Sequence, residues 1–159
     1  MANDNELHIY QTMSKAKSIL ISGVIAGTLD AIAAILLYAR PVNLHNISKI
    51  FRYIASGLHG KPAYYTGAFY PFAGLVLHYL IATIWAAIYI LILLRVFKPG
   101  SVWLKTFLFG SLIWVIMNGF VMPVAGLTAH YDGWAIMRSY AVILVCVALP
   151  IILITEKRG

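Results

Sequence analysis

The chain has 159 residues, of which 62% are hydrophobic and only 11% are charged, and its formal net charge is +7. Soluble domains carry about 25% charged residues and about half apolar ones, so this composition excludes an ordinary water-soluble domain. The sequence predicts one integral membrane domain over residues 1–159. Because its basic residues flank apolar runs, we expect them to contact the bilayer and its anionic headgroups rather than nucleic acid.

Four apolar segments are long enough to cross a membrane as helices, namely residues 18–39, 71–97, 102–125 and 135–155. A helix needs about 20 residues to cross about 30 Å of hydrocarbon. The first apolar run exceeds the core of a signal peptide and lacks a small-x-small cleavage site, so we expect it to be retained. Pro71 suits a first helical turn, so the second helix is expected to begin there. The predicted fold is an all-α membrane protein, a four-transmembrane-helix bundle.

The connection between the first two spans has a helical pattern of its own over residues 44–58. Its apolar residues recur at helical spacing, with polar residues largely between them: Leu44, Ile47, Ile50, Phe51, Ile54 and Leu58. This pattern predicts a short interfacial amphipathic helix in the headgroup plane. A helix packed over the mouth of the bundle is the alternative.

Four spans place both chain termini on one side of the membrane. Seven basic residues belong to that side: Lys15, Lys17, Arg95, Lys98, Lys105, Lys157 and Arg158. Five belong to the opposite side: Arg40, Lys49, Arg52, Lys61 and Arg138. Since cytoplasmic loops carry an excess of Lys and Arg, the count favours cytoplasmic termini.

Five polar residues within the spans fall in the membrane half away from the termini, here called the distal half: Asp30, His78, Asn118, Arg138 and Tyr140. At a rise of about 1.5 Å per residue, Asp30 lies about 13 Å below the distal surface. The same rise places His78 and Asn118 about 10 Å deep. Arg138 and Tyr140 lie about 5–8 Å deep. These residues are the candidate ligand or proton site.

Asp30 is the most informative member of this group. An ionised Asp at the centre of a transmembrane helix costs about 2.5–3.5 kcal/mol, so we expect it inside the bundle with His78 or Arg138 as its partner. Asn118 and Tyr140 are candidate hydrogen-bonding neighbours. Two interpretations remain open at this point. The group is either a pocket for a ligand or a proton, or a clamp in which polar side chains join helices.

Small residues one turn before Asp30 predict a helix contact. Gly23 and Gly27 form a GxxxG pair with Ala26 between them, and small residues let two helix backbones approach closely. GxxxG pairs are common by chance in apolar helices. The pattern therefore supports packing within the chain more than homodimerisation.

We expect no metal, no cofactor and no catalytic residues. His45, His59, His130 and Asp132 lie in the connections on the distal side, but a metal site needs several such ligands to converge. The sequence has no HExxH motif, P-loop or GxGxxG, and no nucleophile motif that would complete a Ser-His-Asp arrangement. With Cys146 as the only cysteine, no intrachain disulfide can form.

Two motifs in the second and third spans carry a family resemblance. One is Phe72–His78, read as FAGLVLH, with its continuation through Tyr89. The other includes Trp103, Gly110 and Asn118, followed by the run MPVAGLT over residues 122–128. These segments, roughly a third of the chain, resemble the YagU-type family of small bacterial inner-membrane proteins. The family pattern has a His where this chain has Asn118. The resemblance implies a bacterial inner membrane and no established chemistry.

Two functions remain compatible with these features. The favoured one is a non-enzymatic binding, accessory or structural subunit, acting as a homo-oligomer or with a membrane partner protein. The alternative is a transporter or channel component that handles protons or a small polar solute through Asp30 and His78. Four spans line a path only narrowly, so transport would require an oligomer.

Overall fold

A computed structural model of the chain describes residues 4–60, 67–96, 100–127 and 132–156. This described part is helical and contains no strand. Four helical stretches are long and apolar enough to cross a membrane: Lys15–Tyr38, Phe69–Val96, Val102–Val124 and Gly133–Glu156. They confirm the predicted all-α fold with four potential spans.

Three of the four spans are interrupted by a π-helical segment. The first is continuous within α1 (Asp4–Tyr38). The second consists of α4 (Phe69–Ile88), η1 (Tyr89–Leu93) and α5 (Leu94–Val96). The third consists of α6 (Val102–Ile116), η2 (Met117–Val121) and α7 (Met122–Val124). The fourth consists of α8 (Gly133–Val142), η3 (Ile143–Ala148) and α9 (Leu149–Glu156). Such π segments are frequent at functional sites.

Two helices begin earlier than the apolar pattern indicates. Helix α1 starts at Asp4, because the polar residues before the span include strong helix formers. Helix α4 starts at Phe69, two residues before Pro71. Proline is tolerated there because the first N–H groups of a helix have no partner within it.

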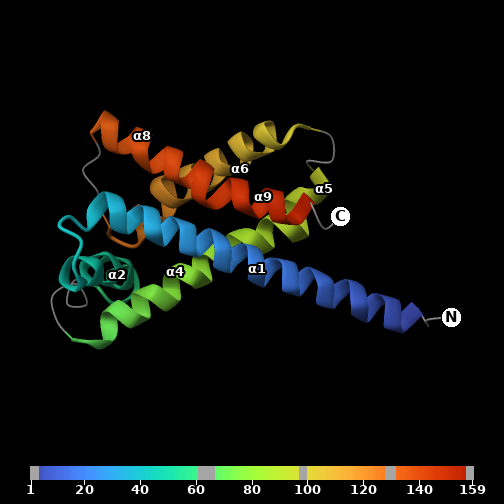
Figure 1. Cartoon of the computed structure of the whole chain (residues 1–159), viewed down its shortest axis with the longest axis horizontal. Helices are drawn as coiled ribbons and strands as arrows, with labels where there is room; N and C mark the ends of the chain where they lie inside the picture. The colour runs from blue at the N-terminus through green and yellow to red at the C-terminus, as the bar shows by residue number, and fades with distance from the viewer. Residues whose placement is uncertain (1–3, 61–66, 97–99, 128–131, 157–159) are drawn as a thin grey trace.

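Helix α2 (Leu44–His59) lies at the end of the bundle opposite the start of α1 and the end of α9 (Figure 1). Asn43 caps it by accepting a hydrogen bond from the Asn46 N–H at 2.8 Å. Its inner face is packed on α4, where a Cβ atom added to Gly74 would lie 1.8 Å from the Phe51 carbonyl oxygen. Phe51, Ala55 and Ser56 are buried. Helix α2 is thus packed against α4 at the distal end of the bundle.

The largest fully buried side chains of the described residues lie in the half of the bundle next to the termini, here called the proximal half. Tyr89, Phe109, Ile151 and Ile152 are fully buried there. The Tyr89 and Phe109 rings pack with their centroids 4.9 Å apart. Large apolar side chains are exposed on all four spans, as expected of helices that face lipid. The proximal half therefore joins the spans through ordinary apolar packing.

Candidate functional site

A cavity of about 380 Å³ lies in the distal half, with walls contributed by all four spans and by α2. Three of the five predicted site residues line it: Asp30, His78 and Asn118. Arg138 and Tyr140 are not among its described lining residues. The remaining walls are mostly apolar, and ligand pockets for drug-sized molecules occupy about 300–1,000 Å³. The cavity is therefore large enough for one small molecule.

The Asp30 carboxylate and the His78 imidazole meet at the cavity wall. Asp30 Oδ2 lies 3.9 Å from His78 Nε2, and the two side chains are 29% and 12% exposed. A hydrogen bond to oxygen requires about 2.7–3.2 Å, so this pair is in electrostatic contact but not hydrogen-bonded. No other described group bonds the Asp30 carboxylate.

His78 is held in place by the backbone of α1. Its Nε2 lies 2.8 Å from the Gly27 carbonyl oxygen. Because a carbonyl oxygen can only accept, Nε2 carries a proton and donates it to Gly27. The ring also packs edge-on against Phe51 of α2 at 6.3 Å and Tyr79 at 5.7 Å between centroids. The imidazole therefore ties three helices together, with its Nε2 proton directed at the backbone.

Asn118 lies in η2 on the same cavity. Its Nδ2 donates to the Trp114 carbonyl oxygen at 3.0 Å, four residues earlier in the third span. The neighbouring Met117 and Val121 also line the cavity. The π-helical segment of the third span thus forms one wall, with the Asn118 amide as its polar group.

The two predicted residues of the fourth span lie elsewhere. The Arg138 guanidinium carbon is 5.9 Å from the Trp134 ring centroid, which is within cation–π range. Tyr140 Oη is 2.7 Å from Ser111 Oγ. Since Ser111 donates its own proton to the Phe107 carbonyl, Tyr140 is the donor to Ser111. The structure thus brings Asp30 together with His78 but not with Arg138 or Tyr140.

The small residues of α1 place Asp30 by packing against α4. Ala26 is fully buried. A Cβ atom on Gly23 would lie 2.7 Å from Thr83 Cα, and one on Gly27 would lie 2.9 Å from Tyr79 Cδ1. This close approach lets His78 reach the Gly27 carbonyl, and it directs the next turn of α1 toward the cavity.

No protein-family model matches this chain, and no curated protein or solved structure matches it. The resemblance to the YagU-type family therefore stays a prediction. The geometry of the described residues is the basis for the function proposed below.

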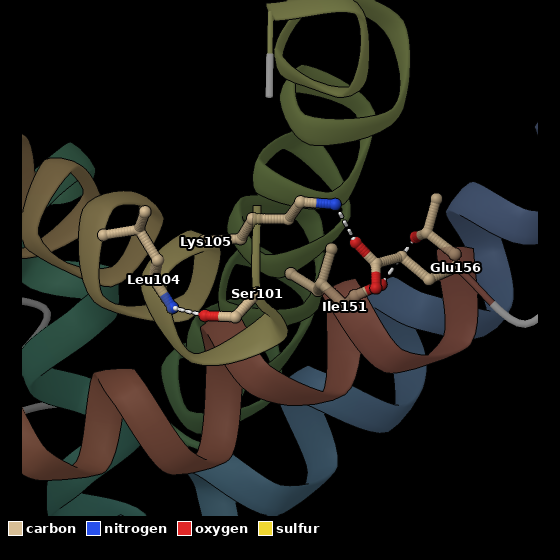
Figure 2. Close-up of polar contacts among 6 residues, drawn as sticks. Ser101, Leu104, Lys105, Ile151 and Glu156 are labelled. Atoms are coloured by element: carbon tan, nitrogen blue, oxygen red, sulfur yellow. Dashed lines mark hydrogen bonds and ion pairs between the residues drawn. The ribbon is translucent and has the colours of Figure 1, made fainter. Parts of the chain in front are cut away.

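A second polar cluster, in the proximal half, is absent from the sequence-based prediction. Lys105 of α6 forms an ion pair with Glu156 of α9 (Figure 2), and their side chains are 11% and 27% exposed. The sequence-based prediction counts Lys105 among the basic residues on the side of the termini, which are expected to contact lipid headgroups. Glu156 ends the fourth span at the same depth, and that shared depth was the available signal.

Three hydroxyl oxygens are also buried in the proximal half. They belong to Ser22, Tyr89 and Thr106, and none has a hydrogen-bond partner among the described residues. They come from the first, second and third spans. The proximal half therefore contains polar groups as well as its apolar core.

The described residues contain no group of three or more His, Cys, Asp or Glu side chains that could hold a metal ion. Asp132 instead caps α8, accepting from the Ala135 N–H at 2.6 Å. The His59 ring packs against Tyr70 at 5.6 Å. His130 lies outside the described residues, as do Lys61, Lys98, Lys157 and Arg158 of the charge count.

Proposed function

We propose that this protein is a small, non-enzymatic binding protein of the membrane, whose distal cavity holds a small amphiphilic molecule. One observation carries the proposal: a mostly apolar cavity of about 380 Å³ collects Asp30, His78 and Asn118 from three different spans. Apolar pockets with a few convergent polar groups are typical of small-molecule sites. The apolar walls would hold the hydrophobic body of the ligand, and the polar residues would orient its head.

The spacing of Asp30 and His78 supports a pocket over a clamp. In a clamp, polar side chains of neighbouring helices hydrogen-bond to each other across the interface. Here the two side chains remain 3.9 Å apart, and the His78 Nε2 proton is taken by the Gly27 carbonyl. The carboxylate therefore stays available to a molecule in the cavity.

Fluorine NMR on the full chain in lipid nanodiscs tests the proposal, with para-fluorobenzyl alcohol as the probe. Ala34 lines the cavity, whereas Ile32 is 49% exposed on the outer face of the same helix. We expect saturable binding to the wild type and to Ile32→Phe, and weaker binding to Ala34→Phe, whose added ring occupies part of the cavity. Equal, non-saturable signals from all three proteins and from empty nanodiscs would refute a binding cavity.

Transport of protons or a small polar solute is the second candidate. It is favoured by the buried Ser22, Tyr89 and Thr106 hydroxyls, because they place polar groups in the proximal half as well. Proteoliposomes with a pH-sensitive dye inside separate the two functions. Binding alone predicts the same proton leak with and without the protein. A leak that the protein adds and that Asp30→Asn abolishes would make transport the function.

For the membrane setting, we propose a bacterial inner membrane, cytoplasmic termini and an α2 helix at the lipid interface. The seven-to-five basic count and the family resemblance support this placement, as does the exposed position of Lys49 on α2. In a Cys146→Ser background, an impermeant thiol reagent added outside should label Lys49→Cys and not Gly159→Cys. The reverse pattern would invert the orientation, and labelling of both or neither would contradict the span count.

A further inference from the structure

We propose that the ligand of the distal cavity is a small organic cation, an ammonium group on a hydrophobic body, bound with its charge against Asp30. This inference rests on the proposed binding function and adds the charge and chemical class of the ligand. Three features of the cavity carry it: a carboxylate that no described residue hydrogen-bonds, its aromatic walls and its size.

The described cavity wall has an acidic side chain that no lining Lys or Arg matches. Asp30 is the only Asp or Glu among the described lining residues, and these include no Lys or Arg. Arg138, which the sequence predicts as a candidate partner of Asp30, lies against Trp134 instead. His78 is within 3.9 Å, but its Nε2 proton is used by the Gly27 carbonyl. The carboxylate therefore lacks a hydrogen-bonded counter-charge from the described chain.

A cationic ligand would remove this imbalance. A carboxylate in apolar surroundings is costly unless a counter-charge or hydrogen bonds accompany it. A neutral ligand would leave the charge in place and displace water from it, and an anionic ligand would be repelled. Because charges interact more strongly where water is scarce, the cavity wall strengthens the attraction between Asp30 and a bound cation.

Aromatic residues on three helices line the same cavity. Tyr38 of α1, Tyr53 of α2 and Trp85 of α4 are among its lining residues. The faces of Tyr and Trp rings attract cations, and quaternary ammonium groups are commonly bound in this way. The aromatic walls therefore favour an organic ammonium ion whose surface is partly apolar.

The size of the cavity and the coordination needs of metal cations narrow the chemical class of the ligand further. A volume of about 380 Å³ is near the lower end for small-molecule pockets, so it fits one compact molecule rather than a lipid or a peptide. An inorganic divalent cation requires several oxygen or nitrogen ligands. The described residues provide no such group around Asp30. The proposed ligand is thus an organic monocation.

The test compares two probes of the same shape on the full chain in nanodiscs of zwitterionic lipid. They are the para-fluorobenzyltrimethylammonium cation and para-fluoroneopentylbenzene, in which carbon replaces the charged nitrogen. Fluorine NMR titrations give both affinities. We expect the wild type to bind the cation at least about tenfold more tightly, a factor that corresponds to about 1.4 kcal/mol.

Three variants assign that preference to Asp30. Asp30→Asn should lose it while still binding the neutral probe, and Asp30→Glu should retain part of it. Asp132→Asn is the matched control, because Asp132 is an exposed helix cap and Asn caps equally well. Thermal melting of each variant checks that it is folded.

The outcomes separate this inference from the proposed function. Equal affinities for the two probes in the wild type would overturn the cation proposal and leave a neutral-ligand cavity standing. A preference for the cationic probe that persists in Asp30→Asn would also overturn the cation proposal. If neither probe binds and the para-fluorobenzyl alcohol titration also fails, both proposals are overturned.

Discussion

The distal and proximal halves of the bundle each contain a carboxylate within or at the end of a span, and they treat it differently. In the proximal half, Glu156 pairs with Lys105 where α9 meets α6. In the distal half, Asp30 faces a cavity and receives no hydrogen bond from the described residues. The first charge is paired with a lysine, whereas the second has only the His78 imidazole nearby among the described residues, at 3.9 Å.

The two halves also differ in packing, and the proximal half is the more fully buried one. Phe109, Ile151 and Ile152 are fully buried in the proximal half, whereas most of the cavity walls in the distal half are only partly buried. Folds tend to break local rules of packing and charge pairing at functional sites, where stability is given up for function. We infer that the proximal half mainly holds the spans together, and that the distal half is adapted to binding.

The largest expected effect on stability comes from disturbing the contact between α2 and α4 at Gly74. Gly74→Val would place a side chain against the Phe51 carbonyl, which is backbone and cannot rotate away. We expect a loss of about 3 kcal/mol or more in unfolding free energy, together with loss of probe binding. Denaturation in mixed detergent micelles measures the first quantity. Gly119→Ala is the control, since nothing among the described residues lies within 4 Å of its added Cβ. Equal effects of the two changes would mean that α2 does not pack against α4 at Gly74.

A second prediction concerns the α1–α4 contact that supports Asp30. Gly23→Ala should cost about 2 kcal/mol, because the new methyl group meets the Thr83 backbone at 2.7 Å. Gly27→Ala should cost less, about 1 kcal/mol, since it meets the edge of a Tyr79 ring that can shift. Leu36→Ala, at a position 55% exposed, should change the unfolding free energy least of these three variants. The ranking is checked by the same denaturation assay, and a reversed order would remove the glycine face from the interface.

A third prediction tests the paired charge of the proximal half. Lys105→Met leaves Glu156 without its counter-charge and should cost about 2 kcal/mol, less than a fully buried pair because Glu156 is 27% exposed. The double variant with Glu156→Gln should recover part of this loss. A double-mutant cycle on unfolding free energies measures the coupling. Additive effects would show that the pair contributes no mutual stabilisation.

Much of the fold was predictable because membrane-spanning helices can be recognised in a sequence by their length and apolar composition. The rise per residue also placed Asp30, His78 and Asn118 at similar depths, and they do line one cavity. Depth alone does not give rotation about the helix axis. Tyr140 lies in the same membrane half but bonds Ser111, and Arg138 packs on Trp134.

Two features were beyond sequence reasoning for physical reasons. The position of α2 depends on the close packing of Gly74 against a backbone carbonyl. The sequence contains many glycines, and nothing in it distinguishes this one. The Lys105–Glu156 pair was missed because charges near the ends of spans usually reach the headgroups. The Lys105 side chain is instead only 11% exposed, since its helix packs against α9.

The smallest expected effect on stability is that of Asp30→Asn, and it sharpens the comparison most. The change removes a charge that has no hydrogen bond from the described residues and whose burial is costly, so we expect no loss of unfolding free energy. Glu156→Gln makes the same carboxylate-to-amide change in the proximal half, where it leaves Lys105 without its counter-charge. We expect it to cost about 2 kcal/mol. Both free energies come from the same denaturation assay, without added probe. A loss for Asp30→Asn as large as that for Glu156→Gln would mean that Asp30 holds His78 in place. The distal polar group would then be a clamp between α1 and α4.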